Sequence, residues 1–225
     1  LADNPEMLRQ TKRALADTGL KVHDIELARV HDDVRPTKYL PAMEVAAELG
    51  ATAVLSSIWT PNRDDALEKF GQICDLARQF GLTVDLEFVP IASVNTLAGA
   101  VDVLRTVNRP NAGLMIDVHH FHRAQDNPAD LDELPREWFH FAHLCDAQAA
   151  IPEDRAEMIR ILREERLYVG EGGIPIADIL NRLPAMVYSI ELPHLARAKE
   201  FGYAEHAARC LESAKQYAAL NVVHT

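Results

Sequence analysis

The sequence has no long apolar run and few cysteines. None of its apolar stretches approaches the ~20 residues that a membrane-spanning helix requires, and the first ten residues lack the basic start and the apolar run of a secretion signal. The three cysteines, Cys74, Cys145 and Cys210, form no recognisable pairing pattern, which is typical of free thiols in a reducing compartment. We therefore expect a cytoplasmic protein with no membrane partner.

Basic residues are also scarce relative to acidic ones. The chain has 23 Lys and Arg against 34 Asp and Glu, which gives a formal net charge of -11. Affinity for a phosphate backbone comes mainly from clustered Lys and Arg, so we expect no nucleic-acid partner. This charge is still compatible with one small anion bound by a local arginine.

The 225 residues are sufficient for one α/β domain, and nothing in the composition requires a second. Helical patterns alternate with apolar segments, and strands are expected to begin near residues 22, 52, 83, 112, 138 and 187. A spacing of about 30 residues is typical of parallel βαβ units and of (β/α)8 barrels. The chain begins with a leucine directly before a predicted helix, so we expect its natural N-terminus to be absent.

Six predicted strands suit a doubly wound open sheet better than a closed barrel of eight. The placement of polar residues along the predicted strands nevertheless favours the barrel. In the segment 82–89, Thr83, Asp85 and Glu87 share one face and the opposite face is apolar, whereas a strand covered by helices on both faces would be continuously apolar. A barrel accounts for this pattern, because its polar faces line the upper interior. We therefore predict a (β/α)8 TIM barrel.

Four chemically reactive residues stand at the C-terminal ends of predicted strands, on the inward face: Glu87, Asp117, His143 and Glu191. Active sites of barrels occupy that end. A single acidic residue at a strand end is more often a helix cap or a salt-bridge partner, but four at one depth favour a shared cation. A mostly oxygen donor set suits Mn²⁺, Mg²⁺ or Co²⁺, with Zn²⁺ as a weaker alternative.

Five motifs make a family resemblance specific: VDLEFVP (84–90), GLMIDVHHFHRA (113–124), FHFAHLCDA (139–147), GEG (170–172) and YSIELP (188–193). The chain resembles the xylose isomerase-like TIM-barrel superfamily, especially the sugar phosphate isomerase/epimerase branch with tagatose-type ketose 3-epimerases and inosose-processing enzymes. The resemblance implies that Glu87, Asp117, His143 and Glu191 are the metal ligands and that His120 contacts substrate. It also implies that one or two strands of the barrel are missing from the N-terminal side of this chain.

The pattern departs from the ketose epimerases at position 149, where alanine stands in place of a substrate-contacting arginine. Arg155 or Arg166 of the same loop are the expected substitutes. The Gly170–Gly173 turn, which carries Glu171, could line the pocket and offer backbone N–H groups to an anion. Trp59 would form an apolar wall for the substrate, although core packing explains it equally well.

The histidines around His120 are less informative. His119 and His122 are expected to be ordinary residues of a loop after the strand that ends near Val118.

The resulting prediction is a divalent-metal-dependent isomerase or epimerase acting on a sugar or keto-polyol. Glu87 and Glu191 would remove and return a proton through a metal-stabilised enediolate. A dehydratase of an inosose or cyclic keto-acid is the main alternative, followed by a non-catalytic sugar-binding barrel. An endonuclease IV-type enzyme is rejected because residues 144–169 contain no histidine. A homo-oligomer stays an open alternative.

Overall fold

The computed structural model describes residues 1–223 and alternates helices with strands along the chain. In chain order the elements are α1 (Pro5–Thr18), β1 (Asp24–Val30), the 3-10 helix η1 (Pro36–Tyr39), α2 (Leu40–Glu48), β2 (Ala53–Ile58), α3 (Arg63–Arg78), β3 (Thr83–Glu87), α4 (Leu97–Val107), β4 (Ala112–Asp117), α5 (Val118–Ala124), the 3-10 helices η2 (Pro128–Glu133) and η3 (Arg136–Trp138), β5 (Phe141–Leu144), α6 (Arg155–Glu164), α7 (Ile176–Leu180), β6 (Val187–Ile190), α8 (Leu195–Phe201) and α9 (Tyr203–Asn221). The predicted alternation of helices and strands is therefore confirmed.

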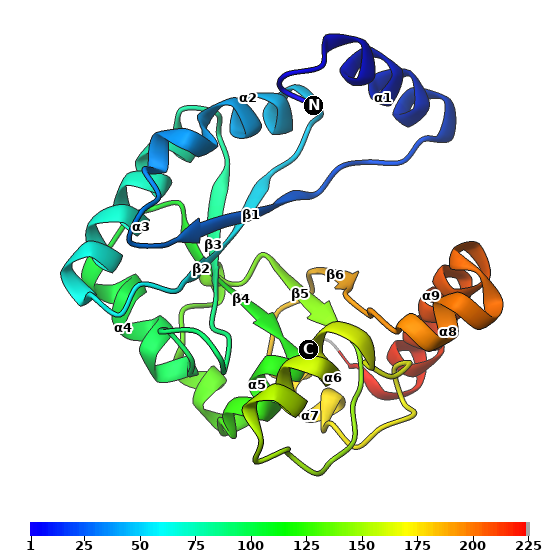
Figure 1. Ribbon diagram of the computed structural model, residues 1–225. Coiled ribbons are helices and arrows are strands. Elements are labelled where there is room, and N and C mark those ends of the chain that lie inside the picture. The colour runs from blue at the N-terminus through cyan, green and yellow to red at the C-terminus, as the bar shows by residue number, and fades with distance from the viewer. Residues whose placement is uncertain (224–225) are drawn as a thin grey trace. The chain divides into compact units, whose positions relative to one another are not determined.

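The chain divides into two compact units. The first comprises Leu1–Phe88, Ala92–Val94 and Ala98–Leu114; the second comprises Val89–Ile91, Asn95–Leu97 and the chain from Met115 onward. In the first unit, β2 pairs in parallel with both β1 and β3, and α2 and α3 pack against these strands (Figure 1). In the second unit, β5 pairs in parallel with β4 and β6.

Local sequence signals determine where helices α1 and α3 begin and where α1 ends. The Asn4 side chain accepts a hydrogen bond from the Met7 amide, Pro5 stands at the first helical position, and Gly19 closes α1 with a φ of 71°. Asn62 caps α3 in the same way. These are the residue types that commonly begin and end helices.

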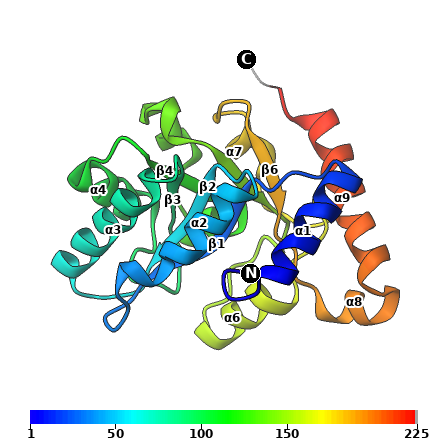
Figure 2. The ribbon, with the colours of Figure 1, turned by 90° about the horizontal axis from the view of Figure 1, so that it is seen from above.

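The C-terminal helices belong to the second unit. Helix α8 packs against α9, and Figure 2 shows α8 next to the start of α9. The buried face of α9 carries His206, Cys210 and Ala214. Cys210 joins a buried cluster with Cys145, Tyr168 and Leu192. This alanine-rich helix, α9, therefore serves packing.

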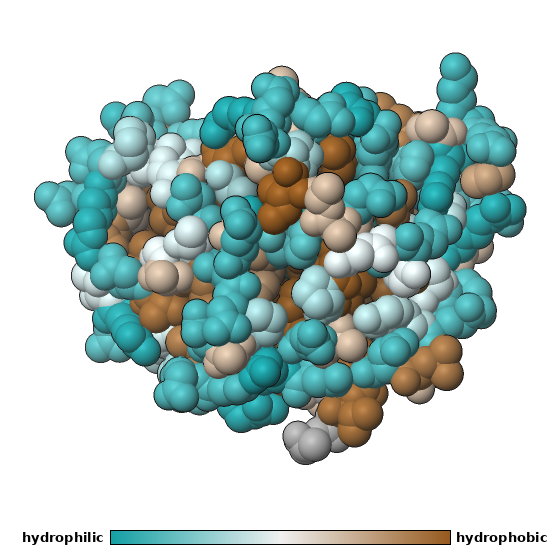
Figure 3. Space-filling view, turned by 90° about the horizontal axis from the view of Figure 1, so that it is seen from below, coloured by the Kyte–Doolittle hydropathy of each residue, from teal (hydrophilic) through white to brown (hydrophobic). Residues whose placement is uncertain are grey.

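Polar side chains dominate the face shown in Figure 3, with smaller apolar groups between them. This distribution is ordinary for a globular protein, because apolar atoms always contribute a large share of the surface. Among the described residues, no helix combines the length and the apolar character that crossing a bilayer would require.

The glycine-rich turn is held by a buried aspartate. Asp146 Oδ2 accepts hydrogen bonds from the amides of Gly170 (3.0 Å) and Gly172 (2.9 Å), and its Oδ1 accepts from Ala147 (2.8 Å) and Ile174 (3.1 Å). The expectation that this turn offers its amides to an anionic ligand is therefore wrong for Gly170 and Gly172. A carboxylate of the chain itself already occupies those donors.

The same turn gives a stability prediction. A Cβ at position 172 would overlap the Ala147 carbonyl oxygen and Asp146 Oδ1, so we expect Gly172→Ala to lower the free energy of unfolding by about 2 kcal/mol. Gly71→Ala, in the interior of α3, is the control; its Cβ would stand 3.5 Å from Val107 Cγ1, an ordinary contact. Urea denaturation measures both variants, and equal stabilities would contradict the overlap.

Candidate metal centre

Three of the four predicted ligands lie together in the second unit. Asp117 ends β4, His143 lies in β5, and Glu191 directly follows β6. Each offers one ligand atom, and these atoms lie within 4.8 Å of one another. His143 Nδ1 stands 3.3 Å from Glu191 Oε2. The parallel register explains the convergence, because Asp117 is the register partner of His143 across β4 and β5.

Glu87 has the corresponding position in the first unit. It is the last residue of β3 and the register partner of Ser57 in β2. Its place at the C-terminal end of a parallel strand agrees with the sequence analysis. Its participation in the centre stays a prediction.

A buried arginine, Arg166, accompanies the carboxylates. Its guanidinium is fully buried, and Nη1 lies 2.7 Å from Asp117 Oδ2 and 3.0 Å from Glu191 Oε2. Nη1 also donates to the Glu191 carbonyl oxygen at 3.1 Å, and Nε donates to Leu162 O at 3.0 Å. Burial would raise the pKa of Asp117, but the Arg166 charge and the adjacent histidines hold it well below its usual range.

The donor set of the second unit fits a divalent cation. Two carboxylates and one imidazole face one another, and one guanidinium balances a single negative charge. Carboxylate oxygen with one imidazole suits Mn²⁺, Mg²⁺ or Co²⁺, and Zn²⁺ also accepts these ligands. Asp117, His143 and Glu191 would hold the ion, and Glu87 would complete the predicted set.

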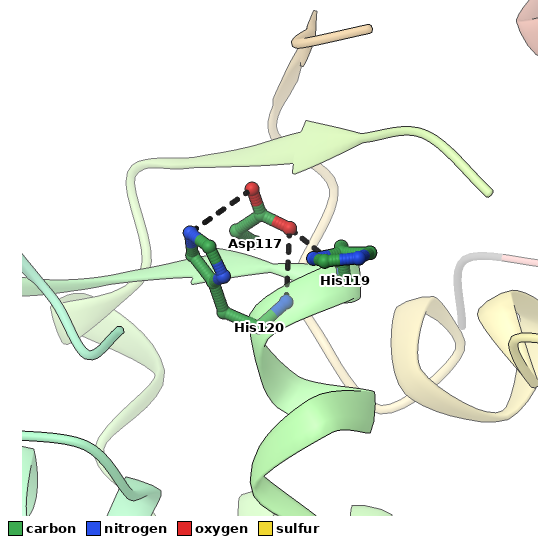
Figure 4. A group of neighbouring side chains, drawn as sticks. All are labelled: Asp117, His119 and His120. Atoms are coloured by element: carbon green, nitrogen blue, oxygen red, sulfur yellow. Dashed lines mark hydrogen bonds and ion pairs between the residues drawn. The ribbon is translucent and has the colours of Figure 1, made fainter. Parts of the chain in front are cut away.

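Asp117 is also the N-cap of α5. Its Oδ1 accepts hydrogen bonds from the amides of His119 (2.7 Å) and His120 (3.2 Å), and the two imidazole rings lie on different sides of the carboxylate (Figure 4). The expectation that His119 and His122 lie in a loop is therefore wrong, because this cap begins a helix there. The cap fixes the direction in which the second carboxylate oxygen points.

Both neighbouring histidines are buried and neutral at physiological pH. Burial lowers the pKa of His119 to about 2 and that of His120 to about 4. His120 Nε2 lies 3.8 Å from Asp117 Oδ2. Asp117, His119 and His120 form a second group whose ligand atoms lie within 4.8 Å of one another, and this group shares Asp117 with the first. Substrate contact by His120 stays a prediction.

Each remaining predicted substrate residue has a structural partner. In the first unit, Trp59 Nε1 donates to Ser57 Oγ at 2.9 Å. In the second unit, Arg155 donates to the Ile91 carbonyl oxygen at 2.7 Å, and Glu171 forms a 2.7 Å ion pair with Arg197. Substrate contact by Trp59, Arg155, Arg166 and Glu171 stays a prediction. The structure adds that Arg166 directly contacts two predicted metal ligands.

Comparison with known proteins decides the family. The sequence profile of the family described as xylose isomerase-like TIM barrel matches residues 2–214. The chain belongs to this family. The predicted resemblance and the TIM-barrel fold class are thereby confirmed, and the doubly wound alternative is excluded.

Among curated relatives, the chain is 32% identical over 127 residues to the inosose isomerase of Bacillus licheniformis, a match that spans 55% of this chain and 43% of the relative. It is 27% identical over 195 residues to the 3-dehydroshikimate dehydratase of Pseudomonas aeruginosa, which spans 80% of this chain and 30% of the relative. The chain thus spans less than half the length of these relatives. Both relatives are enzymes.

Two solved structures have the same fold. The IOLI protein with a bound zinc atom superposes with a TM-score of 0.78 at 22% identity, over 96% of this chain and 85% of that one. The D-allulose 3-epimerase from Methylomonas sp. superposes with a TM-score of 0.70 at 18% identity, over 93% and 81% of the two chains. At identities below 25%, these superpositions show that the fold is shared.

Metal retention tests the predicted ligands. We expect wild-type protein that has been loaded with Mn²⁺ or Zn²⁺ and then dialysed to retain a divalent ion. The His143→Gln variant should lose the ion, because the imidazole is one of the few side chains that would bind it. The loss of affinity should be at least the roughly 10–100-fold that removal of an outer-shell partner typically causes. Asp178→Asn, an exposed position in α7, is the matched control. Equal metal content in wild type and His143→Gln, by inductively coupled plasma mass spectrometry, would exclude His143.

Acid sensitivity tests the charge environment of Asp117. Its folded pKa is lower than its unfolded value of about 3.9, so its contribution to stability is fully present above that pH and is lost as the pH falls toward the folded pKa. We expect the free energy of unfolding in EDTA to fall less steeply between about pH 5 and pH 3 in Asp117→Asn than in wild type. Asp178→Asn should keep the wild-type slope. The account of Asp117 fails if both variants behave alike.

Proposed function

We propose that the chain is a divalent-metal-dependent isomerase or epimerase that acts on a sugar or keto-polyol. The observation that carries this proposal is the convergence of Asp117, His143 and Glu191 at the ends of β4, β5 and β6. Relatives named for inosose isomerisation and D-allulose epimerisation support the reaction class. Their substrates are small polyhydroxy ketones, in which a carbonyl stands next to a carbon that bears a hydroxyl group.

The reaction requires removal of a weakly acidic proton beside a carbonyl. A bound divalent ion would polarise that carbonyl and lower the pKa of the neighbouring C–H. The chain must then supply a base that reaches the substrate and an acid that returns the proton. We assign these roles to Glu191 and Glu87, which end different strands.

The two carboxylates of the second unit differ in accessibility, which supports different roles. The Asp117 side chain is 0% exposed and is held by Arg166 and the amides of α5, so it would serve only to hold the ion. The Glu191 side chain is 39% exposed. A carboxylate open to solvent is open to a substrate, and this favours Glu191 as the proton carrier.

His120 would orient the substrate. Because its pKa is lowered to about 4, its imidazole is neutral at physiological pH and can donate one hydrogen bond to a hydroxyl or carbonyl oxygen. Arg155, Trp59 and Glu171 are proposed to line the same substrate. Return of the proton to the opposite face gives epimerisation, and its return to the neighbouring carbon gives isomerisation.

Dehydration is the second candidate, because the 3-dehydroshikimate dehydratase match spans 80% of this chain. The same proton removal followed by loss of a β-hydroxyl would release water and form a new C=C bond conjugated to the carbonyl. A non-catalytic sugar-binding barrel is less well supported, since Asp117, His143 and Glu191 keep their ligand atoms close together. We further propose a cytoplasmic location from the three free, buried thiols, and leave a homo-oligomer open.

Solvent deuterium exchange separates the candidates. The protein is incubated in D₂O with Mn²⁺, Mg²⁺, Co²⁺ or Zn²⁺ and with keto-sugars, inososes or 3-dehydroshikimate. Deuterium uptake without loss of water supports the isomerase or epimerase, whereas a new ultraviolet absorption supports the dehydratase. A protein that binds these ligands without either change is the sugar-binding barrel.

Glu191→Gln tests the proton carrier. The amide keeps the size of the side chain but cannot accept a proton, so we expect turnover to fall by about 10²–10⁴-fold while substrate binding stays measurable. Glu200→Gln, at an exposed position in α8, is the control. Near-normal exchange in Glu191→Gln would remove Glu191 from proton transfer.

A further inference from the structure

A small cavity of about 200 Å³ lies in the second unit, separate from the group of ligand atoms. It is lined by Arg123, Gln148, Ile161, Glu165, Leu167 and His194. Substrate pockets usually measure about 300–1,000 Å³, so this cavity suits one functional group of a larger molecule.

Arg123 is the basic residue among those that line the cavity, and it is only 4% exposed. Its Nη1 donates to the Gln148 carbonyl oxygen at 3.0 Å and lies 2.9 Å from His122 Nδ1. Its Nε and Nη2 are buried and have no hydrogen-bond partner among residues 1–223. A guanidinium keeps its charge, so buried donors without acceptors are unfavourable until an acceptor arrives.

The acidic side chains near Arg123 already have other partners. Glu165, in the same wall, is paired with Arg160 at 2.8 Å, and both oxygens of Asp146 accept backbone amides. Burial is the main reason that the pKa of Arg123 is lowered. The nearby charge of Asp146 opposes this shift without cancelling it. The cavity therefore carries a cation whose charge the described residues leave largely uncompensated.

His194 adds a donor to the same wall. Its Nδ1 accepts a hydrogen bond from the Arg197 amide at 3.4 Å, which leaves the ring proton on Nε2 in the neutral form. Burial lowers the pKa of this imidazole, so the neutral form is the relevant one. One arginine and one N–H donor are an arrangement that recognises oxygen anions.

We propose that this cavity binds an oxyanion of the substrate, a carboxylate or a phosphate ester. This inference rests on the proposed function, because it gives the substrate of that reaction an acidic group. Arg123 supplies the charge and His194 a hydrogen bond.

The position of these residues along the chain links the cavity to the metal centre. Arg123 lies in α5, the helix that begins directly after Asp117. Gln148 follows His143 on the segment after β5, and His194 follows Glu191 after β6. The same three strand-to-helix connections thus carry the ligands and the cavity wall. One small molecule would place its anionic end in the cavity and its carbonyl at the ligands.

Binding of unreactive probes tests this assignment directly. Shikimate and its methyl ester differ in one negative charge, and glucitol 6-phosphate and glucitol differ in about 1.5 to 2 negative charges at pH 7. None of the four has the ketone that the reaction requires. We expect calorimetry on wild-type protein to give at least about tenfold tighter binding, or 1.4 kcal/mol, for one anionic probe over its neutral counterpart. The shikimate pair identifies a carboxylate site, and the glucitol pair identifies a phosphate site.

The titrations are run with bound metal and again in EDTA, because an anion could also coordinate the metal. The preference should persist in EDTA and disappear in Arg123→Met. Arg123→Gln, which keeps hydrogen-bonding groups without the charge, serves as a second variant if the first does not fold. Arg163→Met, exposed on α6, is the control and should keep the preference.

Equal binding of charged and neutral probes overturns the proposal, and so does a preference that vanishes in EDTA or survives the loss of Arg123. Because no probe can turn over, these results are independent of the deuterium-exchange assay. Exchange without a charge preference would leave the proposed function intact and remove only the anion site.

Discussion

The second unit is organised around the mutual repulsion of two carboxylates, one buried and one partly exposed. Asp117 and Glu191 bring negative charges within 4.8 Å of each other and of His143, at the ends of adjacent parallel strands. Such a group is stable only if cations or donors compensate it. Arg166 and the α5 amides compensate part of this negative charge from inside the protein. The negative charge that remains is the reason for assigning a divalent ion to the group.

The protein distributes structural and chemical tasks between chemically similar residues. Asp117 is fully buried, caps α5 and pairs with Arg166, so its orientation is fixed before any ligand binds. Glu191 shares the same arginine but is partly exposed, which makes it the better candidate for contact with substrate. Asp146 has a purely structural task, because its oxygens hold the glycine-rich turn.

Sequence patterns predicted the parts of this arrangement that depend on strand geometry. Side-chain alternation and the C-terminal ends of parallel strands were sufficient to name Asp117, His143 and Glu191 as neighbours. The pairing of Arg166 with Asp117 joins residues 49 apart in the chain, and no local periodicity encodes such a contact. An aspartate directly before a run of helix-compatible residues is a local signal for the cap at Asp117. The acceptor of the Gly170 and Gly172 amides, Asp146, is not a local signal, because it lies 24 and 26 residues away in the sequence.

We propose that Asp117, His143 and Glu191, together with Glu87, hold one divalent ion. Anomalous X-ray diffraction from crystals grown with Mn²⁺ tests it most directly. The account predicts a single anomalous peak at bonding distance from all four side chains, with Arg166 still beside Asp117. A peak elsewhere, or none at these residues while Arg166 holds both carboxylates, would contradict it.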